Sequence, residues 1–116
     1  MSQHSPATLN VACVQMHWAK TIEYNIKRTE QYIQAAAESG ARVALFPEAS
    51  LTSYYFPYVV ELEPKLIEDA LERTRAAAAA ASIWAIVGTI KKTHDRFLNL
   101  MHVIDPKGAL VHEYAT

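Results

Sequence analysis

Short apolar runs alternate with a long stretch at helical spacing, and this alternation is the sequence feature that most restricts the fold. Residues 9–16 (LNVACVQM) are largely apolar on both alternating faces, as in a strand that is covered on both sides. Residues 41–46 form a second short apolar run. Between them, residues 21–39 repeat apolar side chains on one side of a helix, and Gly40 is a typical stop. The repeated residues are Ile22, Ile26, Ile33, Ala36 and Ala37. Strand, helix and strand in this order predict a parallel pair with a right-handed crossover.

The second half of the sequence predicts another helix and three more strands. A helix over 64–82 is expected, because proline at its start favours a first helical turn. Its inner side carries Ile67, Leu71, Thr74 and Ala78. Residues 83–90 predict a third buried strand and 97–104 a fourth, with the polar KKTHDR between them as a turn. The turn signal at 105–108 makes 109–114 the returning arm of a hairpin. The fold class is therefore α/β.

Size and charge limit the kind of molecule this is. With 116 residues, 51% of them apolar, the chain is one domain or one piece of a larger domain. Its 11 basic and 12 acidic residues form no dense run of either sign. The electrostatic basis for binding nucleic acid or an anionic membrane is therefore missing, and a small neutral partner fits better. No apolar run approaches the roughly 20 residues that span a bilayer.

Cysteine and histidine usage argues against a disulfide and against a metal site. Cys13 is the single cysteine of the sequence, so a reducing, cytoplasmic location is the simpler expectation. In a strand apolar on both faces, Cys13 is expected to be a small core residue and not a reactive thiolate. The five histidines show no paired ligand spacing, so no metal is expected. His17, after the first strand, is interpreted as a solvated loop residue.

An acid follows a proline directly at the end of the second predicted strand. Pro47 biases Phe46 towards an extended backbone, which leaves Glu48 just beyond the strand. In open α/β sheets ligands gather beyond the carboxyl ends of parallel strands. A glutamate partly removed from water there can work as a general base or acid near neutral pH. From spacing alone, this interpretation and an ordinary surface glutamate at the start of a loop fit equally well.

The residues after Glu48 form an aromatic-rich loop, 51–64. Its aromatic residues are Tyr54, Tyr55, Phe56 and Tyr58. Without a surrounding basic patch, a platform for stacking nucleic-acid bases is not expected. The wall of a substrate pocket, or a contact to another subunit, is the better use for such residues.

Several ordered motifs resemble one enzyme superfamily. LFPEASLTSYYF, preceded by VACVQM and by ESGARVALFPE, is similar to the N-terminal part of the nitrilase, or carbon-nitrogen hydrolase, superfamily. IVGTI, FLNLMHVID and DPKGALVHEY continue the match in order. Residues 1–8 are expected to be a polar tail, and the resemblance implies that 9–116 are the N-terminal portion of a carbon-nitrogen hydrolase domain. It also implies that the fold is part of a four-layer αββα sandwich.

The resemblance also assigns roles to single residues. Such enzymes hydrolyse amides or nitriles with a Glu, Lys and Cys triad, through a thioester on the cysteine and without metal or organic cofactor. Glu48 matches the family's glutamate, a general base towards the thiol and later towards water. Tyr54 matches a position near the family's substrate pocket, and packing of the loop by its ring is an equal alternative. Asn99 matches the asparagine of the fourth strand and is interpreted as a structural hydrogen-bonding residue.

Two members of the triad are missing from the match. Thr116 stands where the family has its lysine, which normally stabilises the developing oxyanion. The nucleophilic cysteine normally lies downstream, and Cys13 cannot replace it because VACVQ matches the family's first strand. The prediction is therefore a hydrolase of a small amide or nitrile of which this chain holds Glu48 alone, and which is inactive by itself.

Two alternatives stay open. The first is a truncated, catalytically silent binding or assembly module, for which Thr116 is the support in the sequence. The resemblance favours a homo-oligomer or pairing with an intact relative. The second alternative is that strands with unpaired edges and uncovered apolar faces do not fold stably in this chain alone.

Overall fold

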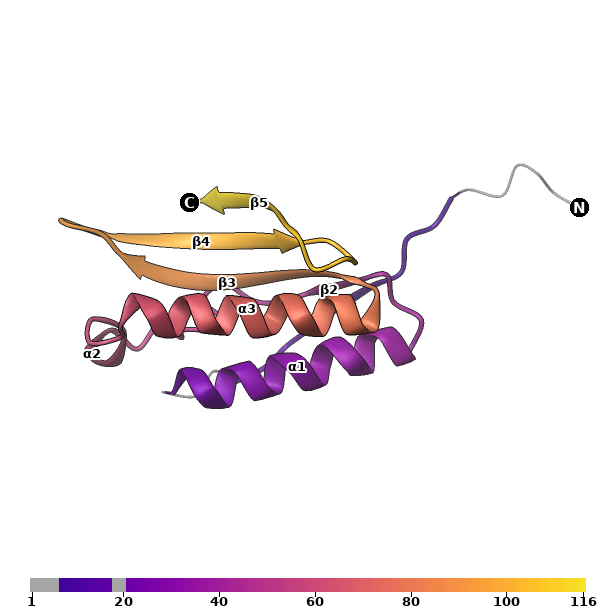
Figure 1. Cartoon of the computed structure of the whole chain (residues 1–116), viewed down its shortest axis with the longest axis horizontal. Helices are drawn as coiled ribbons and strands as arrows, with labels where there is room; N and C mark the ends of the chain where they lie inside the picture. The colour runs from indigo at the N-terminus through magenta and orange to yellow at the C-terminus, as the bar shows by residue number, and fades with distance from the viewer. Residues whose placement is uncertain (1–6, 18–20) are drawn as a thin grey trace, which may run out of the picture.

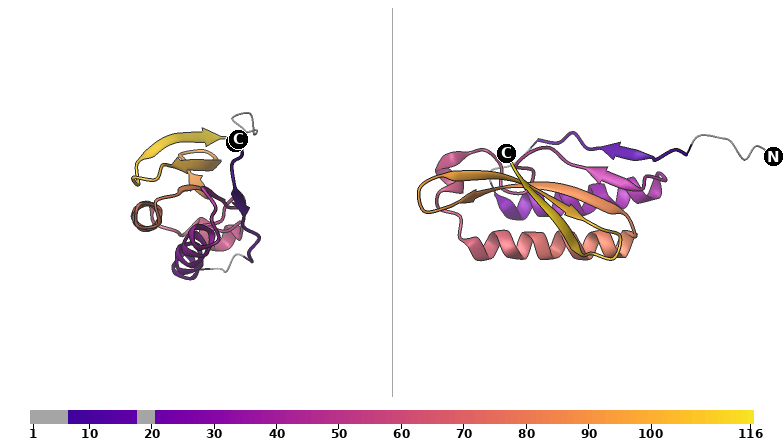
Figure 2. Two further views of the ribbon diagram at one scale, coloured as in Figure 1. Left: turned by 90° about the vertical axis from the view of Figure 1, so that its right-hand side faces the viewer. Right: turned by 90° about the horizontal axis from the view of Figure 1, so that it is seen from above.

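A single mixed sheet carries two long helices on one face (Figures 1 and 2). The structure, a computed structural model, describes residues 7–17 and 21–116. The strands are β1 Val11–Cys13, β2 Val43–Leu45, β3 Trp84–Lys92, β4 Phe97–Ile104 and β5 Leu110–Ala115. The helices are α1 Ile22–Glu38, the short α2 Phe56–Val59 and α3 Pro64–Ala81. The polar tail expected at 1–8 lies largely outside the described residues.

The strands follow one another across the sheet in the order β1-β2-β3-β4-β5. β1 pairs with β2 and β2 pairs with β3 in parallel, each pair joined by a helix that crosses over. β3, β4 and β5 then form an antiparallel meander. The predicted strand, helix and parallel strand at the N-terminus are confirmed, as is the C-terminal hairpin.

Local signals explain where the helices begin and end. The side chain of Thr21 accepts a hydrogen bond from Tyr24 N at the start of α1, as an N-cap residue does. Gly40, with φ of 90°, takes the left-handed conformation that ends the segment. Pro64 occupies the first turn of α3, and Ser82 closes that helix with φ of 56°.

The core lies between the helices and the sheet. On α1 the predicted inner residues Ile22, Ile26, Ile33 and Ala36 are buried. They contact a central row of small and β-branched residues that point to the helical face of the sheet. This row consists of Ala44, Ala85, Val87 and Ile104, each fully buried.

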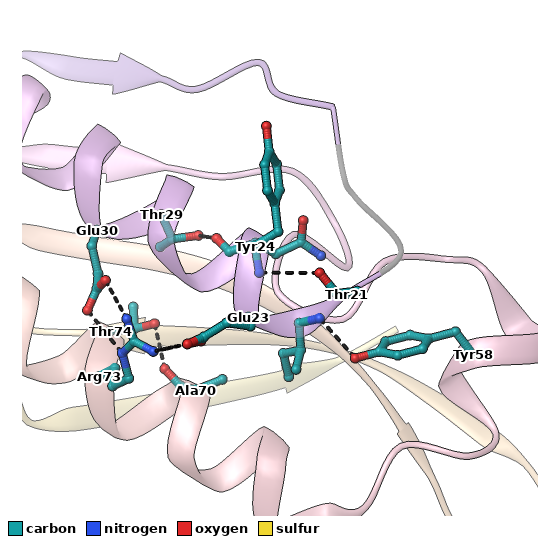
Figure 3. A network of polar contacts seen from close by, with 11 residues as sticks. Thr21, Glu23, Tyr24, Thr29, Glu30, Tyr58, Ala70, Arg73 and Thr74 are labelled. Atoms are coloured by element: carbon teal, nitrogen blue, oxygen red, sulfur yellow. Dashed lines mark hydrogen bonds and ion pairs between the residues drawn. The ribbon is translucent and has the colours of Figure 1, made fainter.

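Polar contacts join α1 to α3 at the surface (Figure 3). Arg73 of α3 lies between two carboxylates of α1, with Nη1 2.8 Å from Glu23 Oε2 and Nη2 2.8 Å from Glu30 Oε1. Inside the interface, Thr29 and Thr74 are buried, and each donates its hydroxyl to the carbonyl four residues earlier. Both threonines therefore satisfy their hydroxyls within their own helix, which leaves no unpaired hydroxyl in the interface.

Over β1, β2 and β5 the second face of the sheet is not covered by the described part of the chain, and this corrects the expectation for Cys13. Cys13 is exposed, and its face also carries Leu45 and Tyr114, 37% and 58% exposed. The two-sided apolar pattern of the first strand is real, but within this chain one side alone meets the core. Cys13 is therefore not a core residue here.

Some details differ from the sequence prediction. The first strand is Val11–Cys13, shorter than the expected 9–16. β3 extends to Lys92 because Lys91 and Lys92 pair with Leu98 and Phe97, which shortens the expected turn. The aromatic loop contains α2, whose Tyr58 hydroxyl accepts a hydrogen bond from Ile22 N at 2.9 Å (Figure 3).

We expect Arg73→Ala to lower the free energy of unfolding by about 1 kcal/mol, because one planar guanidinium serves two carboxylates in a partly exposed network. The loss should shrink in high salt, which screens exposed pairs. Denaturant titrations at low and high salt measure it. Lys65→Ala, which removes the more exposed pair with Asp69 on the same helix, is the matched control and should cost less. An equal loss in both variants would contradict the expectation.

Candidate active site

Glu48 lies in a loop that continues from β2. The loop, residues 46–53, is here called the Glu48 loop. Two of its residues have left-handed backbones, Ala49 with φ of 56° and Ser53 with φ of 74°, and Ser53 N donates to Ala49 O at 2.7 Å. Such a conformation costs a non-glycine residue roughly 1–2 kcal/mol. Backbone strain of this kind is concentrated at functional sites.

The Glu48 loop replaces β2 as the hydrogen-bonding neighbour of β3. Leu51 N donates to Gly88 O at 2.9 Å, and Ser50 Oγ accepts from Gly88 N at 3.0 Å. Further along, Thr52 Oγ1 accepts from Ile90 N at 2.8 Å. The loop thus satisfies backbone groups of β3 that β2 is too short to reach, which buried backbone groups require.

The loop is buried around its base and open at its acid. Ala49, Ser50, Leu51, Thr52 and Ser53 are all 0–1% exposed. By contrast the side chain of Glu48 is exposed. The carboxylate is therefore accessible to a reactant while its backbone is held by buried contacts on both sides.

A short chain of hydrogen bonds leads from Glu48 to β4. The hydroxyl of Tyr54 donates to Glu48 Oε1 at 2.7 Å, and Asn99 Nδ2 donates to the Tyr54 hydroxyl at 3.0 Å. This order of donors is consistent, because the phenol oxygen accepts one bond and donates the other. The three residues come from the Glu48 loop, the aromatic loop and β4, and together they orient one carboxylate oxygen.

Asn99 also connects this cluster to the end of β5. Thr116 N donates to Asn99 O at 3.0 Å, so residue 116 lies beside Asn99 on the neighbouring strand. The side-chain oxygen of Asn99, Oδ1, is buried and has no hydrogen-bond partner among the described residues. An unsatisfied buried acceptor is costly, so this atom is suited to receive a donor that the described residues do not supply.

The pKa of Tyr54 is raised above its ordinary value. Burial disfavours the phenolate, and the neighbouring Glu48 carboxylate adds to this effect, while the hydrogen bond from Asn99 opposes it. Tyr54 is therefore a neutral donor towards Glu48 through the whole neutral range.

The structure brings together the two site residues named from the sequence. Glu48 and Tyr54 are in direct contact. Asn99, expected as a structural hydrogen-bonding residue, bonds through its side chain to Tyr54. Sequence reasoning missed Ser50 and Thr52, although two hydroxyl residues at alternating positions after Glu48 are a signal for side-chain bonds to a neighbouring strand.

No metal centre is present among the described residues. Residues 7–17 and 21–116 contain no group of three or more histidine, cysteine, aspartate or glutamate side chains placed to hold an ion. Likewise, none of the described helices has the length and apolar character that crossing a membrane requires.

Comparison with known proteins points to one family. The model of the carbon-nitrogen hydrolase family matches residues 10–115. Omega-amidase NIT2 of Pongo abelii is 26% identical over 109 residues, which cover 93% of this chain and 40% of that protein. The human omega-amidase NIT2 is 25% identical over 108 residues, with coverage of 92% and 39%. The chain thus spans about two fifths of the length of these relatives.

Solved structures give the same fold. A crystal structure of an amidase from Nesterenkonia sp. superposes with a TM-score of 0.83 at 17% identity, covering 93% of this chain and 42% of that one. A double mutant of the Nesterenkonia sp. AN1 amidase in complex with acrylamide has a TM-score of 0.83 at 16% identity, with the same coverage. The two layers seen here correspond to part of that nitrilase-type α/β architecture.

We expect Gly88→Ala to displace the Glu48 loop. A Cβ at this position would collide with Ala49 N and lie 3.0 Å from Pro47 O, so backbone atoms must move. Overpacking of this kind costs about 1–3 kcal/mol, which a denaturant titration would measure. Loss of the Tyr54–Glu48 contact should accompany it, visible as a changed ultraviolet titration of Tyr54. A variant with unchanged stability would contradict the packing described here.

The Tyr54 pKa gives a second prediction. Because the folded-state pKa lies above the ordinary 10.0, the stability that neutral Tyr54 contributes is complete below pH 10 and is lost as pH rises further. In a titration of tyrosinate absorbance, Glu48→Gln should lower the Tyr54 pKa, because one of its causes is removed. Tyr54→Phe is the control that identifies this residue's share of the signal. An unchanged titration in Glu48→Gln would show that the contact does not persist in solution.

Proposed function

Because the chain belongs to the carbon-nitrogen hydrolase family, we propose that Glu48 is the general base of an enzyme that hydrolyses a small amide or nitrile. The observation that carries the proposal is the Tyr54–Glu48 hydrogen bond of 2.7 Å on a loop with a buried base. A positioned carboxylate that remains accessible is what a general base needs.

In this proposal Glu48 acts twice. For an amide, it first takes the proton of a cysteine thiol, which attacks the carbonyl carbon, and it then returns that proton to the leaving nitrogen, so that ammonia departs and a thioester remains. It then activates the water that hydrolyses the thioester. The Tyr54 hydroxyl is hydrogen-bonded to Oε1 of Glu48, whereas Oε2 has no hydrogen-bond partner among the described residues. Oε2 is therefore the oxygen assigned to proton transfer, and the Tyr54 ring contributes to the substrate site.

Residue 116 takes the place of the lysine that polarises the substrate in the family. Its backbone N–H bonds to Asn99 O, and the side chain of Asn99 bonds to Tyr54, which bonds to Glu48. Thr116 supplies no cation, so this chain lacks the polarising charge, and the thiol must come from another segment or another chain. We therefore propose that the 116 residues alone do not turn over an amide. We also propose that the protein acts in a reducing, cytoplasmic setting, as a homo-oligomer or paired with an intact relative.

A second candidate function is that of a catalytically silent assembly module. The uncovered face of the sheet favours it, with Val11, Leu45 and Tyr114 all exposed. On this alternative the Tyr54–Glu48 contact stabilises a loop and transfers no proton.

A chimera tests the first proposal. Residues 10–116 of this chain replace the aligned segment of human omega-amidase NIT2, with Thr116→Lys added, and ammonia release from a small amide is measured. We expect turnover in this chimera. Glu48→Gln should lower kcat by about 10²–10⁴, the usual contribution of a general base, and reverting Lys to Thr at 116 should lower it by about 10²–10³.

Glu61→Gln serves as the matched control, because Glu61 is also an exposed glutamate in the segment after β2. It should leave turnover unchanged. A folded chimera without turnover, or one whose turnover survives Glu48→Gln, would contradict the proposed function and favour the assembly module.

A further inference from the structure

A buried histidine connects three strands on the helical face of the sheet, away from Glu48. His102 of β4 is 1% exposed. Its Nε2 lies 2.8 Å from Thr89 Oγ1 on β3, and its Nδ1 lies 2.8 Å from Glu113 Oε2 on β5. These three residues, here called the His102 chain, hold β3, β4 and β5 together by side chains in addition to their backbone pairing.

The surroundings of His102 favour the neutral imidazole. Burial lowers the pKa of His102 below its ordinary 6.5, Glu113 opposes the effect and Lys91 adds to it. Nδ1–H then donates to the Glu113 carboxylate, and Nε2 accepts the Thr89 hydroxyl proton. The charged groups around the ring are Glu113 from β5, Lys91 and Lys92 from β3, and Glu68 from α3, which line one cavity of about 240 Å³ beside it.

The order hydroxyl, imidazole and carboxylate matches that of a hydrolase triad, but the geometry argues against nucleophilic catalysis. Thr89 is 1% exposed and lies in the middle of β3, opposite Leu100 of β4. Thr89 lines the cavity, but its hydroxyl is bonded to Nε2 and its side chain is almost wholly buried, so it is poorly placed as a nucleophile. The function of the His102 chain must therefore be sought in what it holds in place.

β5 is the element that most needs an anchor. It is an edge strand whose residues are all exposed, and its pairing with β4 shifts by one register step between Val103 and Ile104. A strand with little burial specifies its register weakly, and a slip of one residue turns each side chain to the opposite face. Glu113 lies directly opposite His102, so their bond selects a single register after the shift.

We propose that the His102 chain is a positioning device for the Glu48 site: by fixing Glu113 opposite His102, it sets the register that places residue 116 beside Asn99. Two residues separate Glu113 from Thr116, whose N–H bonds to Asn99 O. Asn99 in turn bonds to Tyr54 and, through it, to Glu48. The inference rests on the proposed function where it gives residue 116 a place in catalysis. The claim about the register of β5 does not, because it is tested in this chain without an activity measurement.

Amide hydrogen exchange of the full chain provides the test. Glu113→Ala removes a charge-assisted bond, so the Thr116 amide should lose protection by about tenfold or more, while Val87 in the central strand keeps its protection. Glu113→Gln retains an acceptor for Nδ1–H and should restore most of the protection. His112→Ala is the matched control, because His112 is the adjacent exposed residue and points to the opposite face.

Two further readouts separate positioning from general stabilisation. Glu113→Ala should raise the Tyr54 pKa, because displacement of Asn99 removes the bond that lowers it. In the unmodified chain, Thr116 protection should be complete above pH 6.5 and fall below it, because neutral His102 is the form the folded state prefers. This pH dependence should disappear in His102→Gln.

Unchanged Thr116 protection in Glu113→Ala, or an equal loss in His112→Ala, would overturn the proposal. If Glu113→Ala also lost protection at Val87, the pH series of the unmodified chain would decide between positioning and general stabilisation. Protection of the Thr116 amide that does not change with pH would then overturn the proposal. Failure here with an active, Glu48-dependent chimera would reject the positioning role alone. An inactive chimera with the expected exchange pattern would reject the proposed function alone.

Discussion

The hydrogen bonding of β3 is the constraint on which the rest of the structure depends. β3 is the long central strand, and β2, its parallel neighbour, ends at Leu45. Beyond that point buried backbone groups of β3 still need partners, and Ser50, Leu51 and Thr52 provide them. The Glu48 loop is therefore bound to the sheet for reasons of backbone satisfaction. The accessible acid is carried on a segment whose position the core of the molecule already determines.

The elements with strong periodicity were predictable from the sequence, and so was the place of the acid. The helix with Ile22, Ile26 and Ile33 on one side has its expected extent, because each of these residues meets the sheet. The position of Glu48 follows from the proline that ends the second strand. Contacts between distant segments were not predictable in this way. Periodicity contains no information on which strand receives the hydroxyls of Ser50 and Thr52, or on which face of the first strand is left uncovered.

The two faces of β4 carry two separate groups of side-chain hydrogen bonds. On one face Asn99 bonds to Tyr54 near the exposed Glu48, and on the other His102 bonds to Thr89 and Glu113. Because neighbouring residues of a strand point to opposite faces, the two groups share a backbone without sharing a side-chain contact. An edge strand anchored from the helical face can in this way present its end to a site on the opposite face.

The close approach of Gly88 to Ala49 has a consequence for how the sequence can change over time. Ala49 is fully buried with a left-handed backbone, and a single added carbon at Gly88 would meet its amide nitrogen. Gly88 cannot accept a side chain unless the Glu48 loop moves, and the buried, left-handed Ala49 leaves that loop little freedom to do so. Substitutions at the two positions are therefore coupled. A larger residue at Gly88 becomes tolerable after the Glu48 loop around Ala49 has changed its conformation.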